Sequence, residues 1–286
     1  MNEVVVVGAC RTPIGKFLGS LKDVPARQLA VTAGKEAIKR AGIDPSTIDE
    51  IVMGQVYQHM QDSLPARAVG LECGLPFRSA AMVVNQNCSS AMRAVEIAAN
   101  KIMLGKTDIA LTVGVENMTR VPHMLPNART GYRMGSGELV DALLHDALYD
   151  ALVPGHMGLT AENVAQEYGI TREECDQLAL QSHQRAAKAV ASGSFDEEII
   201  PVEIKSKKGT TVFAKDEHFI PDASLEAMGK LKPAFKPDGG VVTAANASGI
   251  NDGAAALVLM SKKKAESLGI KPLGKLVNIV DVGVDP

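Results

Sequence analysis

Short apolar runs alternate along the chain with longer segments in which apolar residues recur every three or four positions. The apolar runs are typical of buried strands and predict strands at 4–8, 51–57, 82–84, 109–115, 199–204, 210–214, 254–260 and 274–282. The amphipathic segments predict helices at 25–41, 66–73, 88–104, 160–168, 172–192 and 262–268. Strands this apolar that alternate with helices indicate an α/β protein with a parallel-type sheet covered on both faces.

Several element ends carry local signals. Pro25 suits a first helical turn, and Gly42 suits the position just after a helix end. Thr171 followed by Glu174 matches a capping box at the start of the longest helix. Residues 251–253, Asn-Asp-Gly, are typical of a turn before the apolar run that follows.

Composition narrows the class of protein. With 286 residues and 46% hydrophobic content, the chain is large enough for one large domain or two ordinary ones. A net charge of −3 gives no bulk electrostatic reason to bind nucleic acid or an anionic membrane. No window has the ~20 apolar residues of a membrane span, and the chain enters its first strand without a leader-like segment. The basic run at 205–209 is interpreted as a solvated turn, with a phosphate contact as the alternative.

The cysteines give the first chemical signal. Four cysteines lie far apart without a Cys-x-x-Cys pair, so neither a disulfide scaffold nor a zinc site is expected, and a reducing cytoplasm fits best. Cys88 opens a small-residue helix after an apolar strand. The first turn of a helix offers unpaired N–H groups and positive potential, which favour a thiolate nucleophile. The alternative is a buried structural cysteine, the role we expect for Cys10, Cys73 and Cys175.

Five segments, in order along the chain, resemble the thiolases, the acetyl-CoA acetyltransferases. They are RTPIGKFLG at 11–19, VNQNCSSAMRAV at 84–95, VGVENM at 113–118, HMGLTAE at 156–162 and VTAANASGINDGA at 242–254. Val113, Val115 and Asn117 depart from the family's Gly-Gly-Met-Glu-Ser-Met. The resemblance implies a layered thiolase fold with a covered mixed sheet.

The resemblance also implies domains. Residues 1–118 and 241–270 are expected to form the thiolase N-terminal domain, and residues 119–240 a loop domain that covers coenzyme A and makes oligomer contacts. Residues 271–286 are expected to be the first strand of a C-terminal domain.

The implied activity is acetyl transfer through an acyl-Cys88 intermediate, in the condensation of two acetyl-CoA or the thiolysis of 3-ketoacyl-CoA. The backbone N–H of Cys88 is expected to help form an oxyanion hole. Contacts to the pantetheine arm or the acyl group are implied for His156, Met157, Phe235, Ala244 and Ser248. Coenzyme A thioesters are substrates, with no separate cofactor or metal, and a homodimer or homotetramer is expected.

Some family features have no counterpart in the 286 residues. The Asn-Glu-Ala-Phe, Gly-His-Pro and Cys-x-Gly-Gly-Gly motifs, which carry the water-holding Asn, the activating His and the acid/base Cys, are not found. Ile220 and Ala227 stand where relatives carry Arg and Ser near the nucleotide. We therefore expect impaired catalysis by this chain alone, and keep as the alternative a non-catalytic module that binds coenzyme A or a partner subunit. A decarboxylating ketoacyl synthase is a third interpretation that lacks two of the five segments.

Individual residues also allow plainer interpretations. Outside its motif, His156 is an ordinary histidine, and Ser248 a turn or helix-cap serine. Glu116 and Asn117 are catalytic by residue type, but a structural role at the strand end is favoured.

Overall fold

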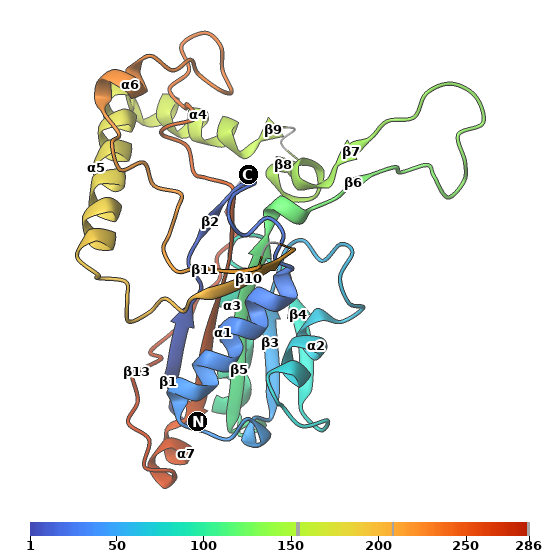
Figure 1. Cartoon of the computed structure of the whole chain (residues 1–286), viewed down its shortest axis with the longest axis vertical. Helices are drawn as coiled ribbons and strands as arrows, with labels where there is room; N and C mark the ends of the chain where they lie inside the picture. Colours follow the sequence, from blue (N-terminus) through green and yellow to red (C-terminus); the bar gives the residue numbers. More distant parts are fainter. Residues whose placement is uncertain (153–154, 208, 285–286) are drawn as a thin grey trace. The chain divides into compact units, whose positions relative to one another are not determined.

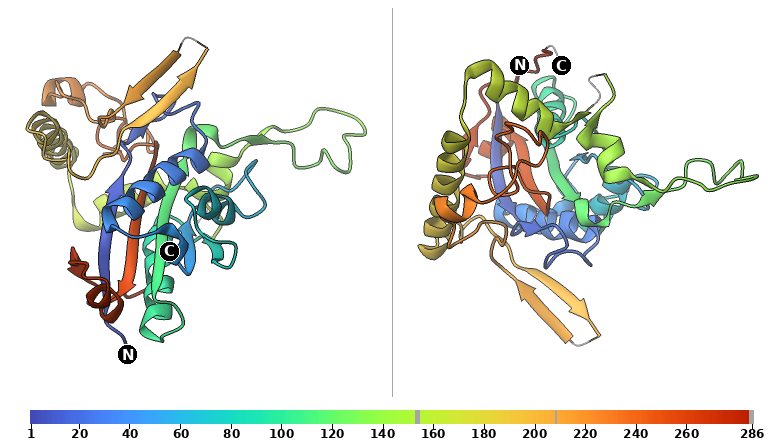
Figure 2. Two further views of the ribbon diagram at one scale, coloured as in Figure 1. Left: turned by 60° about the horizontal axis from the view of Figure 1, so that its bottom comes forward. Right: turned by 90° about the horizontal axis from the view of Figure 1, so that it is seen from above.

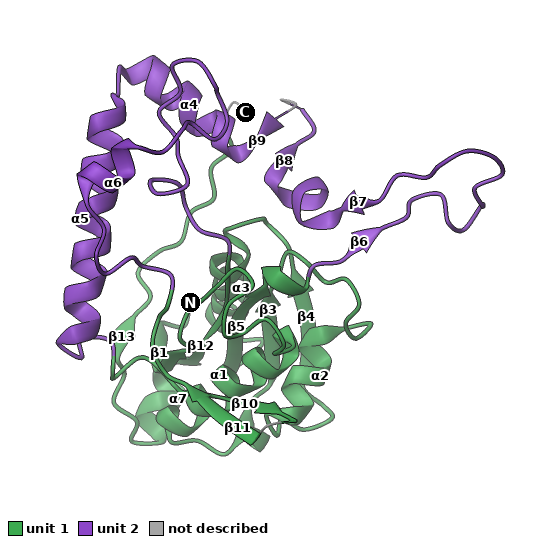
Figure 3. Cartoon of the chain, turned by 45° about the horizontal axis from the view of Figure 1, so that its top comes forward, with its two compact units in different colours: residues 1–120, 196–217, 251–284 green, residues 121–195, 218–250, 285–286 purple. Residues whose placement is uncertain are grey.

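The computed structural model describes residues 1–152, 155–207 and 209–284. The chain forms two compact units (Figure 3). Unit 1 comprises residues 1–120, 196–217 and 251–284, and unit 2 comprises residues 121–195 and 218–250. Relative to the expected domains, residues 196–217 lie in unit 1 and residues 241–250 in unit 2. The assignment of family domains stays a prediction.

A seven-stranded mixed sheet forms the centre of unit 1. Its order is β13-β1-β12-β5-β3-β4, with β2 also paired to β12. The β3–β4 and β3–β5 pairs are parallel, whereas β12 is antiparallel to β1, β5 and β2. The strands are β1 (Val4–Arg11), β2 (Gly15–Lys16), β3 (Glu50–Gly54), β4 (Ala80–Val84), β5 (Ile109–Asn117), β12 (Asn251–Ser261) and β13 (Gly274–Lys275).

Helices cover both faces of this sheet, as Figure 1 shows for α1 and α3. Neighbouring strand residues point to opposite faces, so Val5 packs in the cluster of α1 and α2, and Val4 in the cluster of α3. The helices and short helical turns of unit 1 are α1 (Ala26–Ala41), η1 (Pro45–Thr47), α2 (Pro65–Glu72), α3 (Ser90–Met103), η2 (Met118–Arg120) and α7 (Lys262–Ser267). The expected covered mixed sheet is confirmed.

Three predictions about the sheet of unit 1 are wrong. The sheet is mixed rather than parallel-type, because the late strand β12 inserts between β1 and β5. Residues 251–253 are the start of β12 instead of a turn, since they pair with both β5 and β2. The predicted strand 274–282 is reduced to β13, whose two residues pair with β1.

The predicted helices of both units are present, with ends shifted by a few residues. Gly42 caps α1 in the left-handed conformation, with φ of 67°. Thr171 and Glu174 form the predicted capping box on α5, with both reciprocal hydrogen bonds present. These local signals succeeded because they act within one turn of chain.

The described residues of unit 2 form three helices, a π-helical turn and short strand pairs. Its elements are β6 (His123–Met124), β7 (Val140–Asp141), η3 (Leu144–Leu148), β8 (Tyr149–Asp150), β9 (Gly155–His156), α4 (Met157–Tyr168), α5 (Arg172–Ala191) and α6 (Leu225–Gly229). The predicted hairpin belongs to unit 1 as β10 (Val202–Ser206) and β11 (Gly209–Phe213), a two-stranded ribbon separate from the large sheet (Figure 2). No helix in the described part of the chain is both long and apolar enough to cross a bilayer.

Candidate active site

Cys88 lies in the turn between β4 and α3, and its side chain is exposed. The helix begins at Ser90 with Ser89 as its cap, so the prediction that Cys88 opens the helix is wrong by two residues. The thiols of the other three cysteines are also free: Cys10 and Cys73 are buried and Cys175 is partly buried. Cys88 is therefore the one cysteine of the chain that presents an exposed thiol.

Side chains within the turn fix its shape. The Ser90 hydroxyl accepts a hydrogen bond from the Gln86 N–H at 2.8 Å and donates to the Asn87 carbonyl at 2.6 Å. The Asn87 N–H donates to Asn85 Oδ1 at 2.9 Å. Asn87 itself has φ of 48°, a left-handed conformation that asparagine tolerates better than most residues. The residue before Cys88 is thus held in a left-handed conformation by the hydrogen bonds of the turn.

Two glycines seat the first turn of α3 on the sheet. Gly54 and Gly114 are register partners on the neighbouring strands β3 and β5. A Cβ atom at Gly54 would lie 2.4 Å from the carbonyl carbon and oxygen of Ser90. A Cβ atom at Gly114 would lie 2.5 Å from the Cβ of Ala91. Only glycine allows the helix start that follows Cys88 to approach the strands this closely.

Glu116, near the end of β5, is a partly buried carboxyl beside the turn that follows β3. Its Oε2 accepts hydrogen bonds from the N–H groups of Val56 at 2.9 Å and Tyr57 at 3.4 Å. Burial raises the pKa of Glu116 to about 7; the backbone hydrogen bonds from Val56 and Tyr57 oppose the rise, and the charge of Asp252 adds to it. An acid with this pKa changes its charge near neutral pH.

Replacing Glu116 with glutamine is expected to remove a pH-dependent loss of stability. The folded chain holds a proton on Glu116 that the unfolded chain releases near pH 4.5, so stability falls as pH rises from there to about 7. The shift corresponds to at most roughly 3 kcal/mol. Glutamine has no proton to lose, so urea unfolding at pH 5 and pH 8 should show a smaller decline in the variant. An equal decline in both proteins contradicts this prediction.

In unit 2, His156 caps α4 and packs between two aromatic rings. Its Nδ1 accepts a hydrogen bond from the Gly158 N–H at 3.0 Å, so the proton of the neutral ring is on Nε2. The ring stacks on Phe235 with centroids 4.7 Å apart and meets the edge of Tyr149 at 5.9 Å. A Cβ atom at Gly158 would lie 2.1 Å from the Phe235 ring, so this stacking requires glycine at residue 158.

Buried carboxylates hold the segment that carries Ala244 and Ser248. Glu162, 5% exposed, accepts hydrogen bonds from the N–H groups of Val241 and Val242 at 2.9 Å each. Asp176 on α5, equally buried, accepts one from the side-chain amide of Asn246 at 2.8 Å. Ala244 and Ser248 are both exposed.

The structure brings two of the predicted site residues together, and both belong to unit 2. Cys88 belongs to unit 1, and the other five predicted residues belong to unit 2 (Figure 3). His156 and Phe235 are in ring contact, and Met157, the first residue of α4, is partly exposed.

The residues that support the Cys88 turn and Glu116 were not among the predicted site residues. Gln55 directly follows a fully buried strand and is itself 1% exposed, a position where a polar side chain signals a buried polar site. Gly54 and Gly114 carry no local signal, because the need for glycine arises only when α3 meets the sheet.

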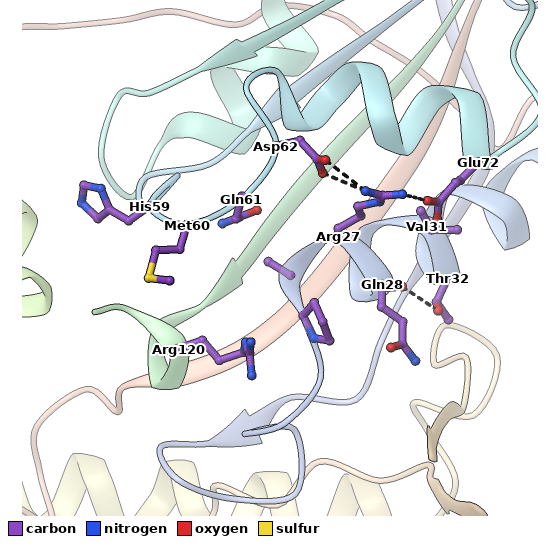
Figure 4. Close-up of a pocket in the computed structure, with 12 residues that line it drawn as sticks. Arg27, Gln28, Val31, Thr32, His59, Met60, Gln61, Asp62, Glu72 and Arg120 are labelled. Carbon is purple, nitrogen blue, oxygen red and sulfur yellow. Dashed lines mark hydrogen bonds and ion pairs between the residues drawn. The ribbon is translucent and has the colours of Figure 1, made fainter. Parts of the chain in front are cut away.

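A surface cavity of about 660 Å³ also lies in unit 1 (Figure 4). Arg27 on its wall forms ion pairs with Asp62 and Glu72, so its charge is already neutralised. None of the predicted site residues lines this cavity. No group of three or more metal-ligating side chains occurs in the described residues.

The chain is similar to known proteins along its whole length. The family model "Thiolase, N-terminal domain" matches residues 4–263. The acetyl-CoA acetyltransferase of Cupriavidus necator is 48% identical over 287 aligned residues, which cover 100% of this chain and 73% of that protein. The acetyl-CoA acetyltransferase of Syntrophomonas wolfei is 51% identical over 288 aligned residues, which cover 100% of this chain and 72% of that protein.

Solved structures of acetyl-CoA acetyltransferases are similar to this chain as well. The structure of an acetyl-CoA acetyltransferase from Syntrophomonas wolfei superimposes with a TM-score of 0.98 at 61% identity, covering 100% of this chain and 71% of that one. The structure of the Bacillus anthracis acetyl-CoA acetyltransferase gives a TM-score of 0.93 at 43% identity, covering 96% of this chain and 69% of that one. On the family match and these relatives together, the chain belongs to the thiolase family.

Proposed function

We propose that the chain is an acetyl-CoA C-acetyltransferase that joins two acetyl-CoA or cleaves a 3-ketoacyl-CoA through an acyl-Cys88 intermediate. The observation that carries the proposal is the exposed thiol of Cys88 in the turn between β4 and α3. It occurs in a chain whose relatives from two bacteria bear the name acetyl-CoA acetyltransferase.

The chemistry divides one condensation into two transfers. Cys88 Sγ, as a thiolate, attacks the thioester carbonyl of acetyl-CoA, the carbon–sulfur bond to coenzyme A breaks, and an acetyl thioester remains on the enzyme. A second acetyl-CoA loses a methyl proton, and its carbanion attacks the acetyl carbonyl. As the carbon–carbon bond forms, the bond from the acetyl carbon to Sγ breaks and Cys88 leaves as a thiolate. The proton lost from the methyl group is balanced by the proton gained by the released coenzyme A, which leaves as a thiol. The Cys88 N–H is our candidate donor to the oxyanion.

The unit 2 residues are proposed to bind the acyl-carrying arm of coenzyme A. The stacked pair of His156 and Phe235 offers an apolar wall with a polar Nε2 proton, and Met157 adds an adaptable apolar contact. Ser248 offers an exposed hydroxyl to the pantetheine amides, with Ala244 nearby in sequence. The hydrogen bonds from Val241 and Val242 to Glu162 hold the segment just before Ala244 in place.

We propose a homodimer or homotetramer in the cytoplasm, with coenzyme A thioesters as substrates and no separate cofactor. The edge position of β4 supports self-association, since the described sheet leaves one side of this strand unpaired. The four free thiols fit a reducing compartment.

Mass spectrometry after a brief incubation of the 286-residue chain with acetyl-CoA tests the proposed function. We expect one acetyl group, mapped by peptide digestion to Cys88, with an equal amount of coenzyme A released. Binding of coenzyme A without an acetyl adduct would favour the non-catalytic module instead. An adduct on another cysteine would contradict the role of Cys88.

A further inference from the structure

The turns that follow β3 and β4 are linked to one another. The two strands run parallel, so both turns leave the same edge of the sheet. The N–H of Gln55 donates to the Val84 carbonyl at 3.1 Å, and the side-chain amide of Asn85 donates to the Val56 carbonyl at 3.4 Å. The second turn contains Cys88, so its position depends on how firmly the first turn is held.

Glu116 holds the first turn from the opposite side. It lies on β5, which pairs with β3 on the edge away from β4. Through Oε2 it accepts the hydrogen bonds of the Val56 and Tyr57 N–H groups described above. A carboxylate that accepts two backbone N–H groups is a stronger anchor than a neutral acceptor.

Asn85 carries the connection on to the nucleophile. Its Nδ2 contacts Val56, and its Oδ1 accepts the N–H of Asn87, the left-handed residue next to Cys88. A left-handed residue other than glycine persists only where its surroundings over-determine it. A continuous series of hydrogen bonds therefore runs from Glu116 through Val56 and Asn85 to the residue before Cys88.

We propose that Glu116 is a positioning residue for Cys88, acting through the Val56 backbone and the Asn85 side chain. The inference rests on the proposed function for the role of Cys88 as nucleophile. It assigns to Glu116 a role beyond the structural one expected at a strand end.

A purely structural acceptor does not need to be ionisable. Glutamine offers the same oxygen to Val56 and Tyr57 without the cost of a buried charge. Oε1 of Glu116 and both side-chain polar atoms of Gln55 are buried with no hydrogen-bond partner in the described residues. Asp252 is the ionisable group that faces Glu116 from β12. The turn after β3 presents backbone N–H groups to Glu116, and α3 approaches β5 through the side chain of Ala91. Because the pKa is about 7, the anchor strengthens as pH rises through neutrality.

The test is the alkylation rate of Cys88 by iodoacetamide, followed by peptide mass spectrometry between pH 6 and 8.5. Iodoacetamide reacts with the thiolate of an accessible cysteine, so the rate depends on how the turn presents Sγ of Cys88 to the reagent. E116A and N85A are each expected to slow alkylation roughly tenfold, the equivalent of one lost hydrogen bond. In the double variant E116A/N85A the two decreases in rate should not add, because each substitution interrupts the same series of hydrogen bonds.

Two further variants separate positioning from general destabilisation. E116Q should recover most of the rate at pH 6, but the ratio of wild-type to E116Q rates should rise with a midpoint near pH 7. E96Q on α3, which removes a carboxylate paired with Arg93, is the matched control and should keep the wild-type rate and profile.

Several results would overturn the inference. They are a folded E116A with the wild-type rate, additive effects of E116A and N85A, or a constant ratio for E116Q. If E116A does not fold, the alkylation rates of N85A and E116Q alone test the inference. Acetyl-CoA is absent from this assay, so a missing acetyl-Cys88 would refute the proposed function without affecting this result.

Discussion

Replacing Cys88 with alanine should lower the rate of acetyl transfer from acetyl-CoA to the chain by ~10⁴-fold or more. No other thiol of the chain is suited to take over. Burial raises the pKa of Cys10 to about 11 and that of Cys73 to about 12, so both are protonated at neutral pH. A single-turnover measurement of coenzyme A release, with the acetyl group mapped by mass spectrometry, gives the rate for each protein.

Cys175→Ala is the matched control for this prediction. Cys175 is partly buried on α5 in unit 2, and burial raises its pKa as well. The control should acetylate at the wild-type rate on Cys88. A Cys88→Ala variant that still acquires one acetyl group at a comparable rate would remove Cys88 from the mechanism.

Gly54→Ala is expected to cost about 3 kcal/mol of unfolding free energy and to disturb the turn of Cys88. The new methyl group would meet backbone atoms of Ser90 and Ala91 at 2.4 and 2.5 Å, and a backbone cannot rotate aside as a side chain can. The first turn of α3 must therefore move away from β3. Urea unfolding measures the loss of stability, and alkylation of Cys88 reports the change in the turn.

Two other glycines sharpen this test. Gly274→Ala, in β13 of the same sheet, places its methyl group in open space and should change stability by less than about 1 kcal/mol. Gly114→Ala meets the side chain of Ala91, so adding Ala91→Gly should restore much of its stability. Equal losses for Gly54→Ala and Gly274→Ala would show that close packing of α3 is not the reason for glycine at residue 54.

The helices of this fold could be predicted well because their signals are local. The periodic apolar positions of α1, its left-handed Gly42 and the capping box of α5 all lie within a turn or two of the residues they control. The largest error in a helix start, that of α4, has a physical reason. α4 begins three residues before the predicted position, at Met157, because the imidazole of His156 acts as its cap.

Strand predictions failed where long-range pairing decides. Residues 251–253 have the composition of a turn, but pairing with β5 and β2 extends them into β12. The apolar residues from 276 to 282 resemble a strand, yet the strand β13 comprises Gly274 and Lys275, and of the later residues Leu276 donates a backbone hydrogen bond to β1. Local composition cannot report which strand lies beside another.

In the candidate site, too, residues with local sequence signals could be predicted and residues that depend on long-range contacts could not. Cys88 could be named from the sequence, because a strand, a polar turn and a small-residue helix are contiguous. The role of Glu116 and the need for Gly54 could not, since each depends on a contact between elements that are far apart in the chain. The roles of the predicted residues in unit 2 remain predictions from family resemblance.

The position of β12 between β1 and β5 has a consequence for synthesis on the ribosome. Strands β1, β3, β4 and β5 are made within the first 117 residues, but the strand that joins β1 to the others begins only at Asn251. All of unit 2 leaves the ribosome before β12 is available to pair with β1 and β5. At ~5–20 residues per second, β1 and β5 wait many seconds with the edges that pair with β12 exposed. Nascent chains arrested before Asn251 should therefore recruit chaperones that bind exposed apolar strands, and chains arrested after Ser261 has emerged should release them.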